Sequence, residues 1–215
     1  MNENTEKEPT VTELGDPRKP HGSAGEAMLK GMNEHHHAVT GWALEFFDLN
    51  GSSRVLDIGC GGGETLRRMA ELVTEGHLTG LDYSPLSVRL SSELNRESVE
   101  SGKMDIISSS VSDMPFEDNS FDRIITVESF YFWPDPSSDL REVLRVLDRD
   151  GIFLITADIH GDAELSAEDK ENVDKYRLFN PTVREFKELL ENAGFHDVII
   201  HTKSGTSWIC AEGRK

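Results

Sequence analysis

A glycine-rich loop preceded by an acid is the part of the sequence that most clearly indicates chemistry. It reads Val-Leu-Asp-Ile-Gly-Cys-Gly-Gly-Gly over residues 55–63. Glycines between a strand and a helix let the backbone approach a ligand closely. The loop lacks the third glycine of the nicotinamide fingerprint and the Gly-Lys-Ser/Thr of a P-loop. Asp57 and Glu64 would also repel a pyrophosphate, so a cationic nucleoside without phosphates fits best.

A second acid, Asp82, ends the next predicted strand. After such a loop, an acid at this place can accept hydrogen bonds from both ribose hydroxyls of a nucleoside. Tyr83 follows it and is placed to lie against an adenine ring, although an aromatic residue at the edge of the core is nearly as good an interpretation. The two acids together predict a nucleoside site at the ends of the first two strands.

Four segments resemble class I S-adenosylmethionine-dependent methyltransferases. The glycine loop resembles their motif I, hhDhGCGxG, residue for residue. The other three resemble the small-molecule branch, which includes the ubiquinone and menaquinone methyltransferases; they are Asp-Met-Pro-Phe-Glu-Asp-Asn-Ser-Phe-Asp at 113–122, Arg-Val-Leu-Asp-Arg-Asp-Gly at 145–151 and Leu-Glu-Asn-Ala-Gly-Phe at 190–195. The resemblance covers about Val55 to Phe195. It implies S-adenosylmethionine as cofactor, S-adenosylhomocysteine as product and a small-molecule methyl acceptor.

The resemblance also implies which residues hold the cofactor. Relatives carry an aspartate after the third strand to bind the adenine amine, and this chain has Ser110 there. A hydroxyl accepts the same hydrogen bond without charge assistance, so it binds more weakly. Val111 can still offer its backbone N–H to the ring. The predicted cofactor-binding residues are Asp57, Gly59, Cys60, Gly61, Gly63, Asp82, Tyr83, Ser110, Val111, Ser112 and Val127.

The catalytic residue is left unknown, with four weak candidates. A ligand in an open α/β sheet lies beyond the carboxyl ends of the strands, which favours Glu128 and Tyr131 after the fourth predicted strand. Relatives carry histidines where Tyr131 and Phe132 stand, so a family-type base is missing there; a buried aromatic cluster is the alternative. His160 follows the fifth predicted strand, and the fourth candidate is His37.

Three adjacent histidines, His35, His36 and His37, precede the first predicted strand. On a continuous helix their side chains point in different directions and lack the i, i+4 spacing of metal ligands, so no metal site is predicted. If this helix covers the active site, one of them can act as a general base near neutral pH. A solvated polar helix face is the favoured alternative.

Short apolar segments alternate with helical periodicity along the chain, which predicts an α/β fold. The predicted strands span residues 54–58, 78–81, 105–109, 124–127, 152–157, 198–200 and 206–210. A tight turn at 203–205 requires the last two strands to be antiparallel. We therefore expect a Rossmann-like, mostly parallel seven-stranded sheet with one antiparallel strand near the edge and helices on both faces.

The chain is predicted to comprise three regions. Residues 1–25 are expected to form a flexible arm, 26–50 an N-terminal cap helix and 51–215 the methyltransferase domain. Within that domain, the acidic segment 161–180 follows the fifth predicted strand. Insertions at this point shape the substrate pocket in the family, so we expect the same here, with a plain solvated crossover helix as an equal alternative.

Composition narrows the function further. The 215 residues include 22 Lys and Arg against 40 Asp and Glu, a formal charge of −18. Such a field disfavours nucleic acid and anionic membranes as partners. With neither a signal peptide nor a membrane-spanning run, and with two cysteines, a cytoplasmic protein is expected. A non-catalytic sensor or scaffold that binds the cofactor or its product, and a protein methyltransferase, remain as alternatives; the acceptor and the oligomeric state are not determined by the sequence.

Overall fold

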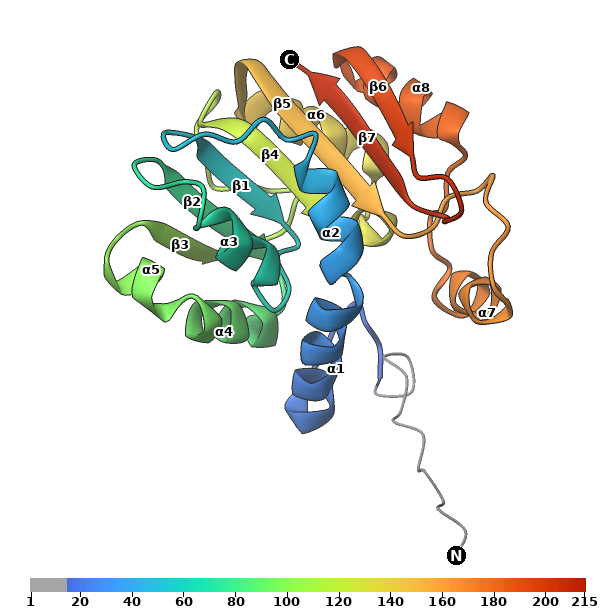
Figure 1. The fold of residues 1–215 in the computed structure, drawn as a ribbon, viewed down its shortest axis with the longest axis horizontal. Helices are drawn as coiled ribbons and strands as arrows, with labels where there is room; N and C mark the ends of the chain where they lie inside the picture. The colour runs from blue at the N-terminus through green and yellow to red at the C-terminus, as the bar shows by residue number, and fades with distance from the viewer. Residues whose placement is uncertain (1–14) are drawn as a thin grey trace, which may run out of the picture.

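The computed structural model describes residues 15–215, so residues 1–14 of the predicted arm lie outside the described residues. Seven strands form one sheet in the order β3-β2-β1-β4-β5-β7-β6, with helices on both faces (Figure 1). The pairs from β3 to β5 are parallel, whereas β7 runs antiparallel to both β5 and β6. The predicted Rossmann-like sheet with one reversed strand near its edge is confirmed.

All seven predicted strands are present, and the observed bounds mostly lengthen them. The strands are β1 (Arg54–Ile58), β2 (His77–Asp82), β3 (Met104–Ser108), β4 (Phe121–Val127), β5 (Leu147–Ala157), β6 (His196–Thr202) and β7 (Ile209–Arg214). The last one corrects the prediction, because residues 206–208 belong to the turn. The Thr206 N–H and hydroxyl both donate to the Lys203 carbonyl, and the same hydroxyl accepts from the Trp208 N–H. These local bonds keep Thr206 out of the strand ladder.

The helices occupy the segments between the strands and at the N-terminal side of the sheet. They are α1 (Gly22–His35), α2 (His37–Leu44), α3 (Glu64–Met69), α4 (Pro85–Leu94), α5 (Arg96–Glu100), α6 (Pro136–Val146), α7 (Ala167–Tyr176) and α8 (Val183–Ala193), with a 3₁₀ turn η2 (Phe130–Phe132) after β4. Within the described part of the chain, none of these helices is both long enough and apolar enough to cross a bilayer.

Three helix boundaries follow directly from local chemistry. The Ser84 hydroxyl accepts the Ser87 N–H at the start of α4, whose first residue is a proline. At the start of α8, Thr182 and Glu185 exchange hydrogen bonds in a capping box. Gly194 ends α8 with φ of 109°, a conformation that favours glycine. Each of these helix ends matches the sequence prediction.

The sheet is buried on both faces, which is why its strands read as nearly continuous apolar runs. On one face, Phe153 packs with Leu140 of α6 and Phe186 of α8. On the other face, Ala43 of α2 and Leu66 of α3 belong to a second apolar cluster. The carboxyl ends of the parallel strands are thus held rigidly at one edge, where the predicted site residues lie.

The N-terminal region differs from the prediction of an arm to residue 25 followed by one cap helix over 26–50. Helix α1 already begins at Gly22, and both Pro20 and Gly25 are buried. A Cβ at Gly25 would collide with the Pro20 backbone, so this glycine allows the chain to pack against its own helix. The helix then breaks at His36, and α2 runs in a new direction from His37 (Figure 1).

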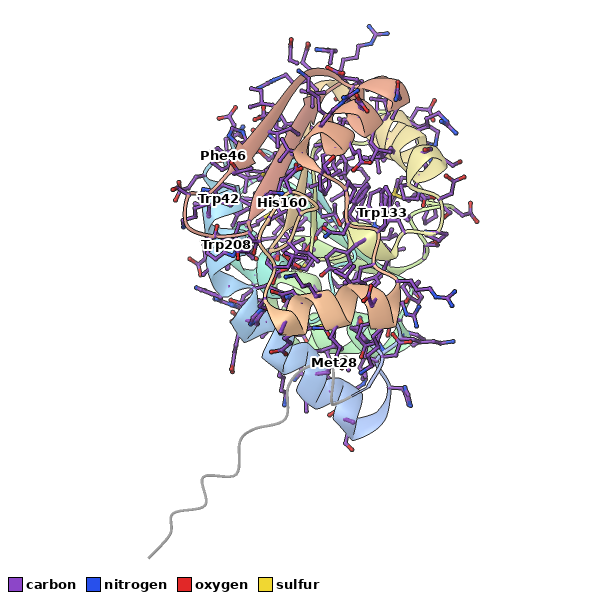
Figure 2. All side chains as sticks on the ribbon, turned by 90° about the vertical axis from the view of Figure 1, so that its right-hand side faces the viewer. Met28, Trp42, Phe46, Trp133, His160 and Trp208 are labelled. Carbon is purple, nitrogen blue, oxygen red and sulfur yellow. The ribbon has the colours of Figure 1, made fainter. Side chains whose placement is uncertain are left out.

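Helix α2 is fixed to the far edge of the sheet by aromatic contacts. The Trp42 ring lies beside Trp208, with 6.1 Å between ring centroids, and both lie on one side of the molecule (Figure 2). Phe46, just after α2, stacks on His201 of β6 at 3.9 Å. Because α2 is anchored in this way, the break at His36 lies at a defined place beside the ends of β4 and β5.

Candidate active site

The glycine loop lies between β1 and α3 and is hydrogen-bonded to the neighbouring strand. The Gly59 and Cys60 N–H groups both donate to the Leu81 carbonyl, at 2.7 and 3.1 Å. Gly59 has φ of 74°, and a Cβ there would collide with the Ser129 side chain. A residue with a side chain would therefore have to distort the loop or displace Ser129. The sequence places glycine here because the backbone of β1 and the segment after β4 approach so closely.

Two buried acids lie under this loop. Asp57 is 1% exposed, and its Oδ2 has no hydrogen-bond partner among the described residues. Burial and then the nearby charge of Asp82 raise the pKa of Asp57 to about 8. The Asp82 carboxylate accepts the Gly61 N–H at 3.0 Å and the Ser84 N–H at 2.8 Å, which fixes its orientation. An unpartnered acid beside a second acid is a site suited to a cationic ligand.

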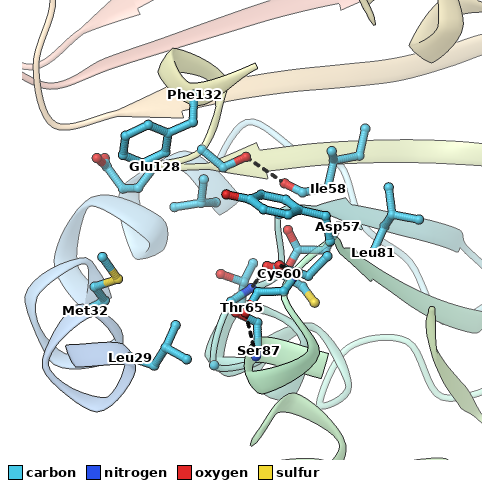
Figure 3. Close-up of a pocket in the computed structure, with 18 of the residues that line it drawn as sticks. Leu29, Met32, Asp57, Ile58, Cys60, Thr65, Leu81, Ser87, Glu128 and Phe132 are labelled. Atoms are coloured by element: carbon cyan, nitrogen blue, oxygen red, sulfur yellow. Dashed lines mark hydrogen bonds between the residues drawn. The ribbon is translucent and has the colours of Figure 1, made fainter. Parts of the chain in front are cut away.

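A cavity of about 390 Å³ opens above these acids. Leu29 and Met32 of α1 face Asp57, Cys60 and Leu81 across it (Figure 3). The structure brings nine of the eleven predicted cofactor residues to its lining: Asp57, Gly59, Cys60, Gly61, Asp82, Tyr83, Ser110, Val111 and Val127.

The other two predicted cofactor residues, Gly63 and Ser112, do not line the cavity. The Gly63 carbonyl accepts a hydrogen bond from Asn95 at 3.0 Å, and Gly63 caps α3 with φ of 83°. The Ser112 hydroxyl donates to Asp139 at 2.7 Å. Both residues stabilise the surrounding backbone, and adjacency in sequence is what placed them in the predicted set.

Tyr83 and Ser110, the residues predicted to contact a nucleoside base, both line the cavity. Tyr83 is 51% exposed at the rim of the cavity, so it is not an aromatic of the core. The Ser110 hydroxyl accepts the Ser112 N–H at 3.2 Å, which orders the loop after β3. The hydroxyl therefore lines the cavity in a fixed loop rather than on a free chain end.

A second cavity of about 620 Å³ adjoins the first. The two share the lining residues Pro17, Met32, His36, Glu128 and Phe132. Helix α7 closes the second cavity on its outer side with Glu168, Asp169, Asn172 and Tyr176. The segment 161–180 thus lines a cavity next to the cofactor-type site, as expected for a segment that shapes a substrate pocket.

Two of the four catalytic candidates meet at the junction of these cavities. Glu128 lines both, and Tyr131 lines the second and donates its hydroxyl proton to Glu128 Oε2 at 2.8 Å. Glu128 has φ of 54°, a strained conformation for a residue with a side chain. Burial, and then the charge of Asp158, raise the pKa of Glu128 well above its ordinary value. Strain and burial of an acid at this place are typical of functional sites.

His37 and His160 line neither cavity. His37 is exposed, and its Nδ1 lies 3.7 Å from Glu64 Oε1. His160 is buried, which lowers the pKa of its imidazole. The structure instead places His36 in the lining of both cavities, where burial lowers its pKa to about 4. The helix break at His36 turns His37 away from His36. Helical periodicity in the sequence alone does not reveal this change of direction.

Asp158 is a second site residue that the sequence reasoning missed. It lies one position beyond β5, lines the second cavity and forms an ion pair of 3.4 Å with His35 Nε2. Its position at the carboxyl end of a parallel strand is a signal that was present in the sequence, since side chains there meet at one edge of the sheet.

Comparison with known proteins points to a methyltransferase, as the resemblance of the four sequence segments does. Residues 56–155 match a family described as a methyltransferase domain. The chain is also 32% identical over 155 residues to 2-methyl-6-phytyl-1,4-hydroquinone methyltransferase 1, chloroplastic, of Oryza sativa subsp. japonica. Residues 56–155 of this chain therefore form a methyltransferase domain. The match covers 72% of the chain and 44% of the rice methyltransferase, so the chain spans less than half of that relative's length.

Solved structures share the fold of this methyltransferase domain. A SAM-dependent methyltransferase from Aquifex aeolicus has a TM-score of 0.69 at 18% identity and covers 87% of this chain and 96% of that chain. Phosphoethanolamine N-methyltransferase 2 of Haemonchus contortus has a TM-score of 0.72 at 17% identity, over 87% and 57% of the two chains. At these identities the likeness shows a common fold.

Proposed function

We propose that this chain transfers a methyl group from S-adenosylmethionine to a small-molecule acceptor. The observation that carries the proposal is the pair of adjoining cavities. The first holds two buried acids under a glycine loop, and the second lies beyond Glu128 and His36, which belong to both linings. Such adjoining cavities let an acceptor in the second lie directly against the methyl group of a cofactor in the first, as an in-line displacement requires.

The residues of the first cavity fit S-adenosylmethionine. Asp57 has an unpartnered oxygen in a buried position, which suits the cationic amino-acid part of the cofactor. Asp82 is oriented by two backbone N–H groups, leaving lone pairs for the ribose hydroxyls. Tyr83, Ser110 and Val111 lie at the expected adenine end. When bound, S-adenosylmethionine supplies a methyl group that is already activated on a sulfonium.

The residues of the second cavity supply alignment and a sheltered space. Phe132 and Met32 contribute apolar surface to the shared wall, and Tyr131 holds the Glu128 side chain in place. Because the methyl donor is already activated, positioning the acceptor and excluding water contribute most of what the protein must provide. The tertiary structure therefore adds a binding space for the acceptor to the cofactor motif.

Partners and location belong to the proposal as well. Supported by the charge of −18, we expect neither nucleic acid nor an anionic membrane surface as partner. A cytoplasmic location is supported by Cys60 and Cys210, which are both free thiols and buried. The rice relative acts on a hydroquinone by its name; for this chain the acceptor stays open.

Calorimetric titration of the full chain with S-adenosylmethionine and S-adenosylhomocysteine tests the proposal. We expect micromolar binding of both, sharply weakened in Asp57→Ala and unchanged in the matched surface variant Glu171→Gln. Formation of S-adenosylhomocysteine is then measured with panels of phenols, amines, thiols and basic peptides. Absence of binding by the folded chain would show that the proposal is wrong. Binding with no turnover on any panel would favour a sensor or scaffold, and turnover on peptides alone a protein methyltransferase.

A further inference from the structure

Four side chains with metal-binding chemistry converge on the wall between the two cavities. His35 and His36 come from the end of α1, Glu128 from the end of β4 and Asp158 from the end of β5. One ligand atom each of His35, His36 and Asp158 lies within 4.8 Å of the other two. His36 Nε2 is 4.0 Å from Glu128 Oε2. Two imidazoles and the Asp158 carboxylate thus approach one point, and the Glu128 carboxylate lies beside His36 at its edge.

His35 and His36 both extend toward this point from the end of α1. The His36 N–H still donates to the Met32 carbonyl, so His36 lies on the path of α1, and the His35 and His36 rings lie with centroids 5.2 Å apart. The break between α1 and α2 comes after His36, and His37, on its far side, turns toward Glu64 instead. The sequence argument excludes a metal site built from all three histidines, whereas this site combines two of them with acids from other segments.

Glu128 provides an independent sign that this point suits a ligand. Its side chain is 3% exposed, and its Oε1 has no hydrogen-bond partner among the described residues, while Oε2 accepts from Tyr131. In Figure 3 its carboxylate points toward the α1–α2 junction. Two acids close together in a sheltered place repel each other unless a cation or proton lies between them. Within the described chain, no lysine or arginine lines the second cavity.

We propose that His35, His36, Asp158 and Glu128 bind one divalent transition-metal ion, of the Zn²⁺ or Co²⁺ type, beside the methyl-transfer site. Imidazole nitrogen together with carboxylate oxygen is a donor set that such ions prefer. Bonds of about 2.0–2.2 Å place neighbouring donors roughly 3–3.5 Å apart. His35 Nε2 and Asp158 Oδ2 already lie at 3.4 Å. The other donor distances, up to 4.8 Å, would have to shorten on binding, and the His35 side chain, which is 67% exposed, leaves room for that change.

The role of the ion rests on the proposed function. The ion would lie at the wall shared by both cavities, so the acceptor class it favours carries a hydroxyl that can coordinate a metal. Coordination makes that hydroxyl more acidic, and its proton leaves to water in the second cavity. The oxygen lone pair then forms the bond to the methyl carbon, while the electrons of the carbon–sulfur bond go to sulfur. The acceptor oxygen thus becomes a methyl ether.

Metal binding is measured on the full, tag-free chain after dialysis against a chelator. Co²⁺ is added and followed by its visible absorption, and Zn²⁺ is titrated by calorimetry. We expect one ion per chain, with affinity lowered about tenfold or more in His35→Ala and in Asp158→Asn. The matched control is His37→Ala, which removes an adjacent imidazole that points away from the cluster; we expect its affinity to stay within about twofold of the unmodified chain.

Two results would overturn the inference. The first is that neither Co²⁺ nor Zn²⁺ binds saturably. The second is that His37→Ala lowers the metal affinity as much as His35→Ala does, which would indicate adventitious binding to an acidic surface. The His35 side chain is mostly exposed, so we expect His35→Ala to fold normally. A loss of metal binding in this variant then reflects the missing imidazole and not unfolding. Affinity for S-adenosylhomocysteine is measured on the same samples. Retained S-adenosylhomocysteine binding without metal binding would remove the metal site and leave the proposed methyl transfer intact.

Discussion

At the scale of single residues, Asp57 controls the electrostatics of the first cavity, which is the proposed cofactor site and is called the cofactor cavity below. Its carboxyl is fully buried beside Asp82, and its pKa is raised to about 8 by burial first and by that second acid next. At neutral pH the free protein therefore holds Asp57 mostly in its neutral form. A bound cation stabilises the ionised form and lowers this pKa, so cofactor binding releases a proton.

We therefore predict that affinity for S-adenosylmethionine rises with pH between about 5.5 and 7.5. Binding to ionised Asp57 requires a proton to leave, so the affinity increases by up to about tenfold per pH unit below a pKa of about 8. This pH range ends below the pKa of the ligand's own amino group, which is about 8. Calorimetry in buffers of different ionisation enthalpy measures both the affinity and the released proton.

The matched variant for this measurement is Asp57→Asn, which keeps the shape of the side chain and cannot ionise. In it the affinity is expected to be low and nearly independent of pH over the same range. A wild-type affinity that stays flat or falls as pH rises would show that Asp57 is already ionised in the free protein.

Gly59→Ala is predicted to destabilise the protein and to weaken cofactor binding. The residue has φ of 74°, and its new methyl group would collide with the Ser129 side chain. Strain and overpacking together are expected to reduce the free energy of unfolding by about 2–4 kcal/mol. Thermal and urea unfolding give the stability, and calorimetry gives the affinity for S-adenosylhomocysteine.

Gly102→Ala separates backbone strain from overpacking, because Gly102 has the same φ of 74° but open space around its Cβ position. Backbone strain alone is expected there, at about 1–2 kcal/mol, with unchanged cofactor affinity. Equal losses of stability in the two variants would mean that the close approach of Ser129 contributes nothing.

At the scale of elements, helix α1 is the cover of the cofactor cavity. It contributes Leu29 and Met32 to the lining, and His36, which also lines the cavity, follows directly after it. The helix forms no part of the sheet. Its contacts with the body include the buried Met28 and an ion pair between Glu26 and Arg89. Exposed ion pairs contribute little to stability. The cover is thus attached more weakly than the strands beneath it, which gives a path for ligand entry.

Hydrogen–deuterium exchange is predicted to show this difference directly. Without ligand, amides of α1 should exchange faster than those of β5, which is buried inside the sheet between β4 and β7. S-adenosylhomocysteine should slow the exchange of α1, because a ligand in the proposed site would lie against Leu29 and Met32, which line the cavity. Mass spectrometry of peptides from both elements measures the rates, with Asp57→Ala as the variant that loses the protection. Exchange in α1 as slow as in β5 without ligand would contradict a mobile cover.

At the scale of the whole molecule, the dominant feature is the charge of −18 over 215 residues. Many of the ion pairs are exposed, such as Arg184–Glu188 and Arg67–Glu71, and they leave this net charge unchanged. Repulsion between like charges opposes the compact state, and salt screens it over a Debye length of about 10 Å at 0.1 M. The same field that disfavours polyanions therefore also limits stability at low ionic strength.

We predict that the melting temperature rises as NaCl is increased from about 0.01 to about 0.5 M, by several degrees. Screening reduces repulsion in the folded state more than in the expanded unfolded chain. Differential scanning calorimetry at pH 7 checks the shift, and KCl serves as the control for an effect specific to sodium. A melting temperature that is constant or falls with salt would show that favourable ion pairs outweigh the net repulsion.

The sequence by itself determined the features that depend on short stretches of chain. The caps at Ser84 and Thr182, the glycine loop and the alternation of strands with helices all arise from interactions between near neighbours in sequence. These local signals are sufficient for the sheet, its reversed strand and most of the predicted residues that line the first cavity. They fail where side chains bond locally within a turn, as at Thr206, and where a helix breaks, as at His36.

The tertiary structure alone decided what lies on the wall between the two cavities. His36, Glu128 and Asp158 come from segments far apart in sequence, and no local periodicity relates them. They meet because α2 is anchored to the outer strands through Trp42 and Phe46, while parallel strands direct β4 and β5 to the same edge. The free energy that places these three side chains together comes from burial of the core on both faces of the sheet, which no single segment carries.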